Sequence, residues 1–143
     1  MYKHLLLPTD GSLLSEDAIQ RGMRFARESG AKVTGLHVLP AFQILTYRTD
    51  MLEDTRATFE KNARAHAEKT LAFVRDVAQK EGVRCETLSI ASESAYQAII
   101  QTARDRGCDL IFMASHGRRG IEGLLLGSET QKVLTHSKIP VLV

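Results

Sequence analysis

The stretch that decides the fold is Leu110-Ile111-Phe112-Met113-Ala114, in which apolar side chains follow one another without interruption. A strand with one face in water alternates apolar and polar residues, whereas an unbroken apolar run of this length is typical of a strand buried on both faces. Parallel sheets bury their strands in this way because helices cover both of their faces. We therefore predict a central strand of a parallel sheet over residues 110–114.

The segments around this run alternate between helical and strand patterns. Apolar residues at steps of three and four predict helices over residues 14–29, 53–80 and 95–106, and a fourth helix that begins at Ser128. The first three patterns are followed by Gly30, Gly82 and Gly107, as expected of glycines that end a helix in the left-handed conformation. Short apolar runs predict further strands over residues 5–7, 33–39, 84–90 and 139–143. This alternation favours an α/β domain with a parallel sheet and helices on both faces.

The composition bounds the size and the partners of the protein. With 143 residues, 43% of them hydrophobic, we expect one domain over residues 1–143. The net charge of +2 does not indicate a broad basic surface, so no nucleic-acid partner is expected. No membrane segment is expected either, because no apolar run reaches about 18 residues. Cys85 and Cys108 form no CxxC motif, and we interpret them as reduced thiols of a cytoplasmic protein.

Two segments that follow strands are candidates for a binding site, because open parallel sheets bind ligands beyond the carboxyl ends of their strands. The first strand leads into Pro8-Thr9-Asp10-Gly11-Ser12, and the fourth leads into a glycine-rich loop that ends at Gly127 and Ser128. Ser128 and Gln131 have the spacing of a capping box. A glycine-rich loop before a helix N-terminus is typical of an anion site. A loop with solvated arginines and an ordinary capped helix would explain the same residues equally well.

The sequence predicts no catalytic set and no metal site. It contains neither the GxxxxGK[ST] motif of a P-loop nor the GxGxxG motif of a dinucleotide fold. A general base must lie near the group that it deprotonates. His116 and Asp10 are candidates for such a base, but they belong to different segments that the sequence alone does not bring together.

Over its whole length the chain resembles the universal stress protein family. The segments that carry the resemblance are Leu7-Pro8-Thr9-Asp10-Gly11-Ser12, Leu36-His37-Val38, Met113-Ala114-Ser115-His116-Gly117, Gly127-Ser128 and Ile139-Pro140-Val141-Leu142-Val143. The resemblance implies a single-domain Rossmann-like fold of the adenine nucleotide alpha hydrolase type. Its five parallel strands would follow the order 3-2-1-4-5, and two chains would pair through the last strand, residues Ile139 to Val143.

One branch of that family binds ATP through a pattern of Gly, two residues, Gly, nine residues, Gly and Ser or Thr. This chain keeps Gly117, Gly127 and Ser128 but has Ala114 in place of the first glycine. The resemblance implies a ribose contact for Asp10 and a backbone contact of Val38 with adenine. It further implies that Met113 packs on the base, that Pro8 and Thr9 lie nearby, and that Gly117, Gly127, Ser128, Glu129 and Thr130 surround the phosphates. For its amide to serve there, Glu129 must turn its carboxylate away from the phosphates.

From this resemblance we expect a cytoplasmic, homodimeric protein that binds an adenine nucleotide and acts as a binding or signalling module in the stress response. The nucleotide would be ATP, ADP or AMP, with Mg²⁺ accompanying the phosphates, and ATP hydrolysis would be slow at most. Two alternatives remain open at this point. One is a dimeric adapter of the same family that binds no nucleotide, and the other is an ATP-dependent hydrolase.

Overall fold

The computed structural model describes residues 1–41, 49–116 and 126–143, with side chains omitted for residues 49–54. Its sheet contains five parallel strands in the order β3-β2-β1-β4-β5, as the resemblance implies. The strands are β1 (His4–Pro8), β2 (Lys32–Pro40), β3 (Cys85–Ser92), β4 (Leu110–Phe112) and β5 (Val141–Leu142). The chain adds β2 and β3 on one side of β1 and then β4 and β5 on the other. The strand order therefore reverses between β1 and β4.

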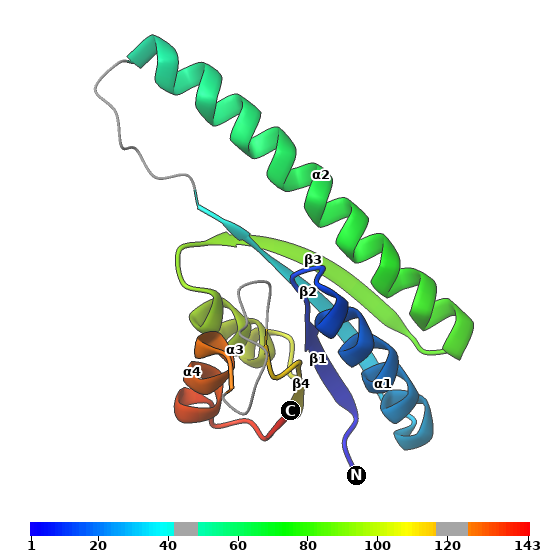
Figure 1. Cartoon of the computed structure of the whole chain (residues 1–143). Coiled ribbons are helices and arrows are strands. Elements are labelled where there is room, and N and C mark those ends of the chain that lie inside the picture. The colour runs from blue at the N-terminus through cyan, green and yellow to red at the C-terminus, as the bar shows by residue number, and fades with distance from the viewer. Residues whose placement is uncertain (42–48, 117–125) are drawn as a thin grey trace.

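Four helices cover the two faces of the sheet: α1 (Leu13–Ser29), α2 (Thr49–Glu81), α3 (Ala95–Asp105) and α4 (Ser128–His136). Figure 1 shows α1 and α2 on one face and α3 and α4 on the other. Each face has its own apolar core. Leu5 and Leu7 of β1 belong to the core beneath α1 and α2, whereas Leu6 belongs to the core beneath α3 and α4. All three leucines are fully buried, as expected of a central parallel strand.

Glycines end three of these helices and permit one close helix–sheet contact. Gly30, Gly82 and Gly107 have φ of 69°, 68° and 70°, so the predicted left-handed helix ends are confirmed. Gly35 lies in β2 beneath α2, where an added Cβ would come within 2.7 Å of Val74 Cγ1. The long helix α2 therefore packs closely on the sheet at this point because β2 has no side chain there.

The predicted element boundaries were wrong at several ends. Strand β4 ends at Phe112 instead of residue 114, and β5 has only two residues instead of five. These two errors are linked, because β4 pairs with β5 over two residues and the last bond, from Met113 N to Leu142 O, spans 3.0 Å. Helix α2 begins at Thr49, four residues before the predicted start. In the described parts of the chain, no helix has the length and apolar character needed to span a membrane.

Candidate functional site

A cleft of about 460 Å³ lies at the carboxyl ends of the strands, around the point where the strand order reverses. Ten of the residues implied by the family resemblance line this cleft. They are Pro8, Thr9, Asp10, Val38, Met113, Ala114, Gly127, Ser128, Glu129 and Thr130. Gly117, the remaining one, lies outside the described residues. Segments far apart in the sequence thus meet at one concave surface.

The cleft has five further lining residues that were not among the implied site residues. They are Ser15, Leu36, Ala95, Ile99 and His116. Ile99 shares the buried stripe of α3, so its helical spacing predicted burial but not a place beside a ligand. His116 was a candidate for a general base, and the structure places it in the same cleft as Asp10. Ser15 lies one turn into α1, where the sequence carries no distinguishing signal.

The turn between β1 and α1 forms one wall of the cleft and is held by its own side chains. Gly11 has a φ of 83°, which L side chains rarely adopt. Its amide donates to Thr9 Oγ1 at 3.2 Å. Asp10 Oδ1 accepts two hydrogen bonds, one from Ser12 N at 2.9 Å and one from Ser15 Oγ at 2.7 Å. The carboxylate of Asp10 therefore stabilises the first turn of α1.

Two histidines form hydrogen bonds with the backbone of the same turn. His37 Nδ1, on β2, lies 2.9 Å from the carbonyl oxygen of Thr9, and His66 Nε2, on α2, lies 3.1 Å from that of Asp10. A carbonyl oxygen only accepts hydrogen bonds, so each of these ring nitrogens carries a hydrogen. The two rings meet edge to face with centroids 5.2 Å apart. The long helix α2 thereby fixes the backbone on which Asp10 is mounted.

The opposite wall is formed by the end of β4 and the start of α4. Thr130 Oγ1 donates to the carbonyl oxygen of Ala114 at 3.0 Å, and Gly127 N donates to that of Ser115 at 2.7 Å. These bonds tie α4 to the residues that follow β4. Gly127 has a φ of −60° and a ψ of 152°, a conformation open to any residue, so its role does not depend on a left-handed backbone.

The predicted capping box at the start of α4 was wrong. Gly127 is the N-cap, and among the described residues no side chain caps this helix. Ser128 is instead the first residue of the helix. Gln131 reaches back past it, and its Nε2 donates to the carbonyl oxygen of Leu126 at 2.8 Å. Glycine at the N-cap leaves the first amides of α4 without the side-chain acceptor that a serine there would supply.

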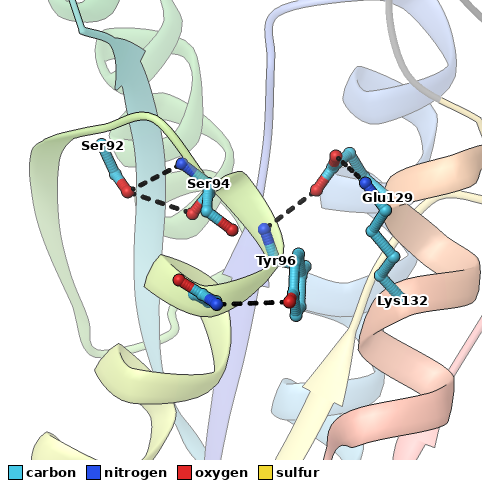
Figure 2. A network of polar contacts seen from close by, with 6 residues as sticks. Ser92, Ser94, Tyr96, Glu129 and Lys132 are labelled. Atoms are coloured by element: carbon cyan, nitrogen blue, oxygen red, sulfur yellow. Dashed lines mark hydrogen bonds and ion pairs between the residues drawn. The ribbon is translucent and has the colours of Figure 1, made fainter.

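Glu129 directs its carboxylate at the neighbouring helix (Figure 2). Its Oε2 accepts a hydrogen bond from Tyr96 N in the first turn of α3 at 2.9 Å, and its Oε1 lies 3.5 Å from Lys132 Nζ. Ser94, the N-cap residue of α3, makes no side-chain cap bond in the described structure, and its Oγ is buried without a hydrogen-bond partner there. Glu129 therefore supplies the cap that Ser94 does not.

The groups with a shifted pKa lie at or next to the amino ends of the strands, opposite the cleft. Burial lowers the pKa of His4, whose Nε2 lies 2.7 Å from Thr34 Oγ1. Burial also raises the pKa of both thiols, Cys85 and Cys108, to about 11. Thiols with a pKa that high are almost entirely protonated near pH 7 and react slowly. Both cysteines are free, as expected.

The charges around the cleft are unevenly distributed. The described lining residues include two carboxylates, Asp10 and Glu129, and one imidazole, His116, but neither lysine nor arginine. Arg118 and Arg119 lie outside the described residues. In the part of the chain that the structure describes, no three His, Cys, Asp or Glu side chains gather to hold a metal ion. The described lining therefore offers backbone N–H groups and side-chain hydroxyls that can donate to an anion. The carboxylates of Asp10 and Glu129 can accept hydrogen bonds from the hydroxyl groups of a ligand.

A parallel sheet in this order, with a cleft where the order reverses, defines the class of doubly wound α/β proteins that bind ligands beyond the carboxyl ends of their strands. The family model described as Universal stress protein family matches residues 1–143. The chain belongs to that family.

Individual relatives agree with this assignment. The universal stress protein YxiE of Bacillus subtilis is 29% identical over 147 residues, which cover 100% of this chain and 99% of YxiE. The solved structure of protein MJ0577 has a TM-score of 0.85 and 28% identity, and the match covers 100% of this chain and 95% of that one. A universal stress protein solved in complex with cAMP has a TM-score of 0.72 and 26% identity, with 99% of this chain and 95% of that chain covered.

Proposed function

We propose that the cleft binds an adenine nucleotide, ATP, ADP or AMP, and that the chain acts as a nucleotide-dependent binding or signalling module of the stress response. The observation that carries this proposal is the pairing of two surfaces in one cleft. Leu36, Val38, Ile99 and Met113 provide apolar lining for a base, and the start of α4 provides amides for an anion. The volume of about 460 Å³ is in the ordinary range for such sites.

The proposed roles are those that the family resemblance implies. Adenine lies against Met113 and the backbone of Val38, and the ribose meets Asp10 with Pro8 and Thr9 nearby. The phosphates lie at the start of α4, beside Gly127, Ser128, Glu129 and Thr130; the resemblance adds Gly117, which lies outside the described residues. The universal stress protein solved with cAMP supports an adenine ligand for a relative of this fold.

Two details of the site bear on the finer features of this proposal. Ala114 stands where the family motif has its first glycine, and its carbonyl oxygen accepts a hydrogen bond from Thr130 Oγ1 on α4. The backbone at this position is therefore tied to the wall where we propose that the phosphates bind. Mg²⁺ would enter with the phosphates as their counterion, because the described residues hold no cluster that would bind it alone.

The experiment that tests this proposal is thermal unfolding with added nucleotide. A ligand that binds only the folded state raises the free energy of unfolding by about 2.7 kcal/mol at a hundredfold excess over its Kd. We expect ATP to raise the melting temperature, and we expect CTP, which lacks the purine, to raise it less. If ATP, ADP and AMP at millimolar concentration all leave the melting temperature unchanged, with and without Mg²⁺, the cleft binds no adenine nucleotide and the adapter alternative holds.

A binding role fits this site better than a hydrolytic one. Asp10 is proposed to contact the ribose and not the phosphates, so it is not placed to activate the attacking water, and its Oδ1 already accepts bonds from Ser12 N and Ser15 Oγ. We therefore propose slow ATP hydrolysis at most. Steady-state turnover at saturating ATP tests this, and rapid multiple turnover would favour the hydrolase alternative.

We further propose that the chain is one domain, that it works in the cytoplasm, and that it forms a homodimer through the last strand. β5 lies at the edge of the sheet, and Leu142 and Val143 are 40% and 47% exposed. An apolar edge strand of this kind pairs readily with its own copy about a two-fold axis. Sedimentation equilibrium at tens of micromolar is expected to give a dimer that Leu142→Lys dissociates. A homogeneous wild-type monomer would contradict the dimer.

A further inference from the structure

Ser15 is a buried serine in the first turn of α1, and its hydroxyl meets the carboxylate that we propose contacts the ribose. Ser15 lines the cleft, yet only 4% of its surface is exposed. Its Oγ donates to Asp10 Oδ1 at 2.7 Å, and Ser12 Oγ in turn donates to Ser15 Oγ at 3.1 Å. Three side chains of the turn between β1 and α1 therefore form one hydrogen-bonded chain that ends on the carboxylate.

The hydroxyl of Ser15 is not what caps the helix. The N-cap of α1 is Ser12, whose Oγ accepts a hydrogen bond from Ser15 N at 3.2 Å. A serine at the N-cap satisfies an amide of the first turn in the ordinary way, and only the backbone of Ser15 takes part in that bond. The helix start is therefore capped without the Ser15 side chain, whose hydrogen is directed to Asp10 instead.

Asp10 is anchored at both its backbone and its side chain. Its carbonyl oxygen lies 3.1 Å from His66 Nε2, and its Oδ1 accepts from Ser12 N at 2.9 Å as well as from Ser15 Oγ. Two donors on one carboxylate oxygen restrict rotation of the group about the Cβ–Cγ bond. The two oxygens of a carboxylate have about four acceptor positions, and these bonds take two of them. Because Asp10 also lines the cleft, its carboxylate presents further acceptor positions there in a defined orientation.

We propose that Ser15 is a positioning residue that orients the Asp10 carboxylate for the hydroxyl groups of a ribose, so that the cleft selects a ribonucleotide over a nucleotide whose sugar lacks these hydroxyls. This inference rests on the proposed nucleotide site. A ribose carries two neighbouring hydroxyl groups that can donate, and hydrogen bonds to an ionised acceptor are about twice as strong as neutral ones. An acceptor already held in its binding orientation loses less conformational freedom when the ligand arrives, which raises affinity.

The test compares AMP with 2′,3′-dideoxy-AMP, which lacks both hydroxyl groups, by isothermal titration. The two ligands carry the same base and the same phosphate, so contacts at the start of α4 cancel in the ratio of their affinities. This ratio, taken within one variant, also does not depend on the folded fraction of that variant.

The variants are Ser15→Ala, Asp10→Ala, the two changes combined, and Ser12→Ala as the matched control. Ser15→Ala should fold, because alanine is the best helix former and Asp10 Oδ1 keeps its bond from Ser12 N. Ser12→Ala removes a serine hydroxyl from the same turn and with it the helix cap. It leaves in place the two groups that hold the carboxylate, Ser12 N and Ser15 Oγ.

In the wild type we expect AMP to bind about tenfold more tightly than dideoxy-AMP, since hydrogen bonds to a charged group are lost. Ser15→Ala is expected to lower this ratio about threefold, and Asp10→Ala to bring it to about one. The combined variant should match Asp10→Ala, because Ser15 acts through Asp10 and has no further effect once the carboxylate is gone. Ser12→Ala should keep the wild-type ratio while it lowers the free energy of unfolding.

Four results would overturn the inference. Equal affinities for AMP and dideoxy-AMP in the wild type would show that the carboxylate does not select a ribose, although the nucleotide site itself would stand. An unchanged ratio in Ser15→Ala would show that Asp10 is positioned without Ser15. A ratio that Ser15→Ala lowers further in the Asp10→Ala background would show that Ser15 acts on the ligand directly. If neither ligand binds to any variant, the proposed nucleotide site fails and this inference fails with it.

Discussion

The two walls of the cleft differ in how their polar groups are satisfied. On the β1 side, Asp10 Oδ1 accepts from Ser12 N at the N-cap of α1 and from Ser15 Oγ in its first turn. His37 and His66 meet the carbonyl oxygens of the same turn. On the α4 side, the helix begins at Gly127 without a side-chain cap from any described residue. In the first wall the protein itself supplies hydrogen-bond partners for the polar groups. The second wall leaves backbone amides to which an anion can bind.

Because of this difference, substitutions in the two walls are expected to have different effects. Substitutions on the β1 side remove hydrogen bonds that exist in the free protein, so they are expected to lower the free energy of unfolding. Substitutions at the start of α4 that block its first amides but keep the bonds of Gly127 N and Thr130 Oγ1 remove contacts that form only with the ligand. They are expected to lower affinity and spare stability. The two readouts therefore separate a wall that supports the fold from a wall that binds.

The largest effect is expected from Gly127→Val. The backbone of Gly127 is in a region open to valine, so the fold should be retained. A branched side chain would occupy the approach of the phosphate to the amides of α4. Amide bonds to a charged oxygen contribute about 1.5 to 3 kcal/mol each, so we expect nucleotide affinity to fall by about a hundredfold or more. Isothermal titration measures the loss, and wild-type affinity in the folded variant would show that this wall is not the binding wall.

Gly11→Ala is expected to have the next largest effect, on stability. An added Cβ would lie 2.8 Å from Thr70 Oγ1 and 3.0 Å from His66 Cε1, in a backbone with φ of 83°. We expect a loss of about 2 kcal/mol in the free energy of unfolding, from backbone strain and the displaced α2 contact together. Chemical denaturation measures it.

Gly30→Ala is the matched control for that experiment. Gly30 has a similar φ of 69°, but nothing lies within 4 Å of an added Cβ. It should therefore cost about 1 kcal/mol from the backbone alone. Equal losses in the two variants would mean that the packing of α2 against the turn contributes nothing.

A smaller effect is expected from Asp10→Ala, which removes the acceptor of Ser12 N and Ser15 Oγ. The expected loss in stability is about 1 kcal/mol. Nucleotide affinity should fall less than in Gly127→Val, since only a ribose contact is lost. Asp10→Asn keeps an oxygen acceptor and should retain most of the stability. Denaturation curves of both variants test this, and an Asp10→Asn variant as unstable as Asp10→Ala would show that the charge, not the hydrogen bonds, holds the turn.

The sequence predicted the architecture well because burial periodicity is a local signal. The apolar run of β4 indicated a strand buried on both faces, and the three consecutive leucines of β1 indicated a strand; both lie inside the sheet. The ends of β4 and β5 were predicted less well. Those ends depend on how far two strands remain paired, which apolar composition does not report.

For the site, the sequence identified the two segments that meet in the cleft but not the bonds that hold them. The brace from His66 to the carbonyl oxygen of Asp10 joins residues 56 apart in sequence, and a lone histidine in a charged helix gives no signal for it. The partner of Glu129 was equally hidden, because its carboxylate meets a backbone amide of α3. Backbone acceptors and donors are common to all residues and leave no pattern in a sequence.

The most direct test of the central claim is an amide NMR titration of the ¹⁵N-labelled protein with AMP. We predict the largest shift changes at the amides of Ser128, Glu129 and Thr130, with smaller changes at Gly127 and Ser12, whose amides are already bonded to Ser115 O and Asp10. Shift changes that are absent at millimolar AMP, or that occur mainly at the β1–α1 turn with the start of α4 unmoved, would contradict the account.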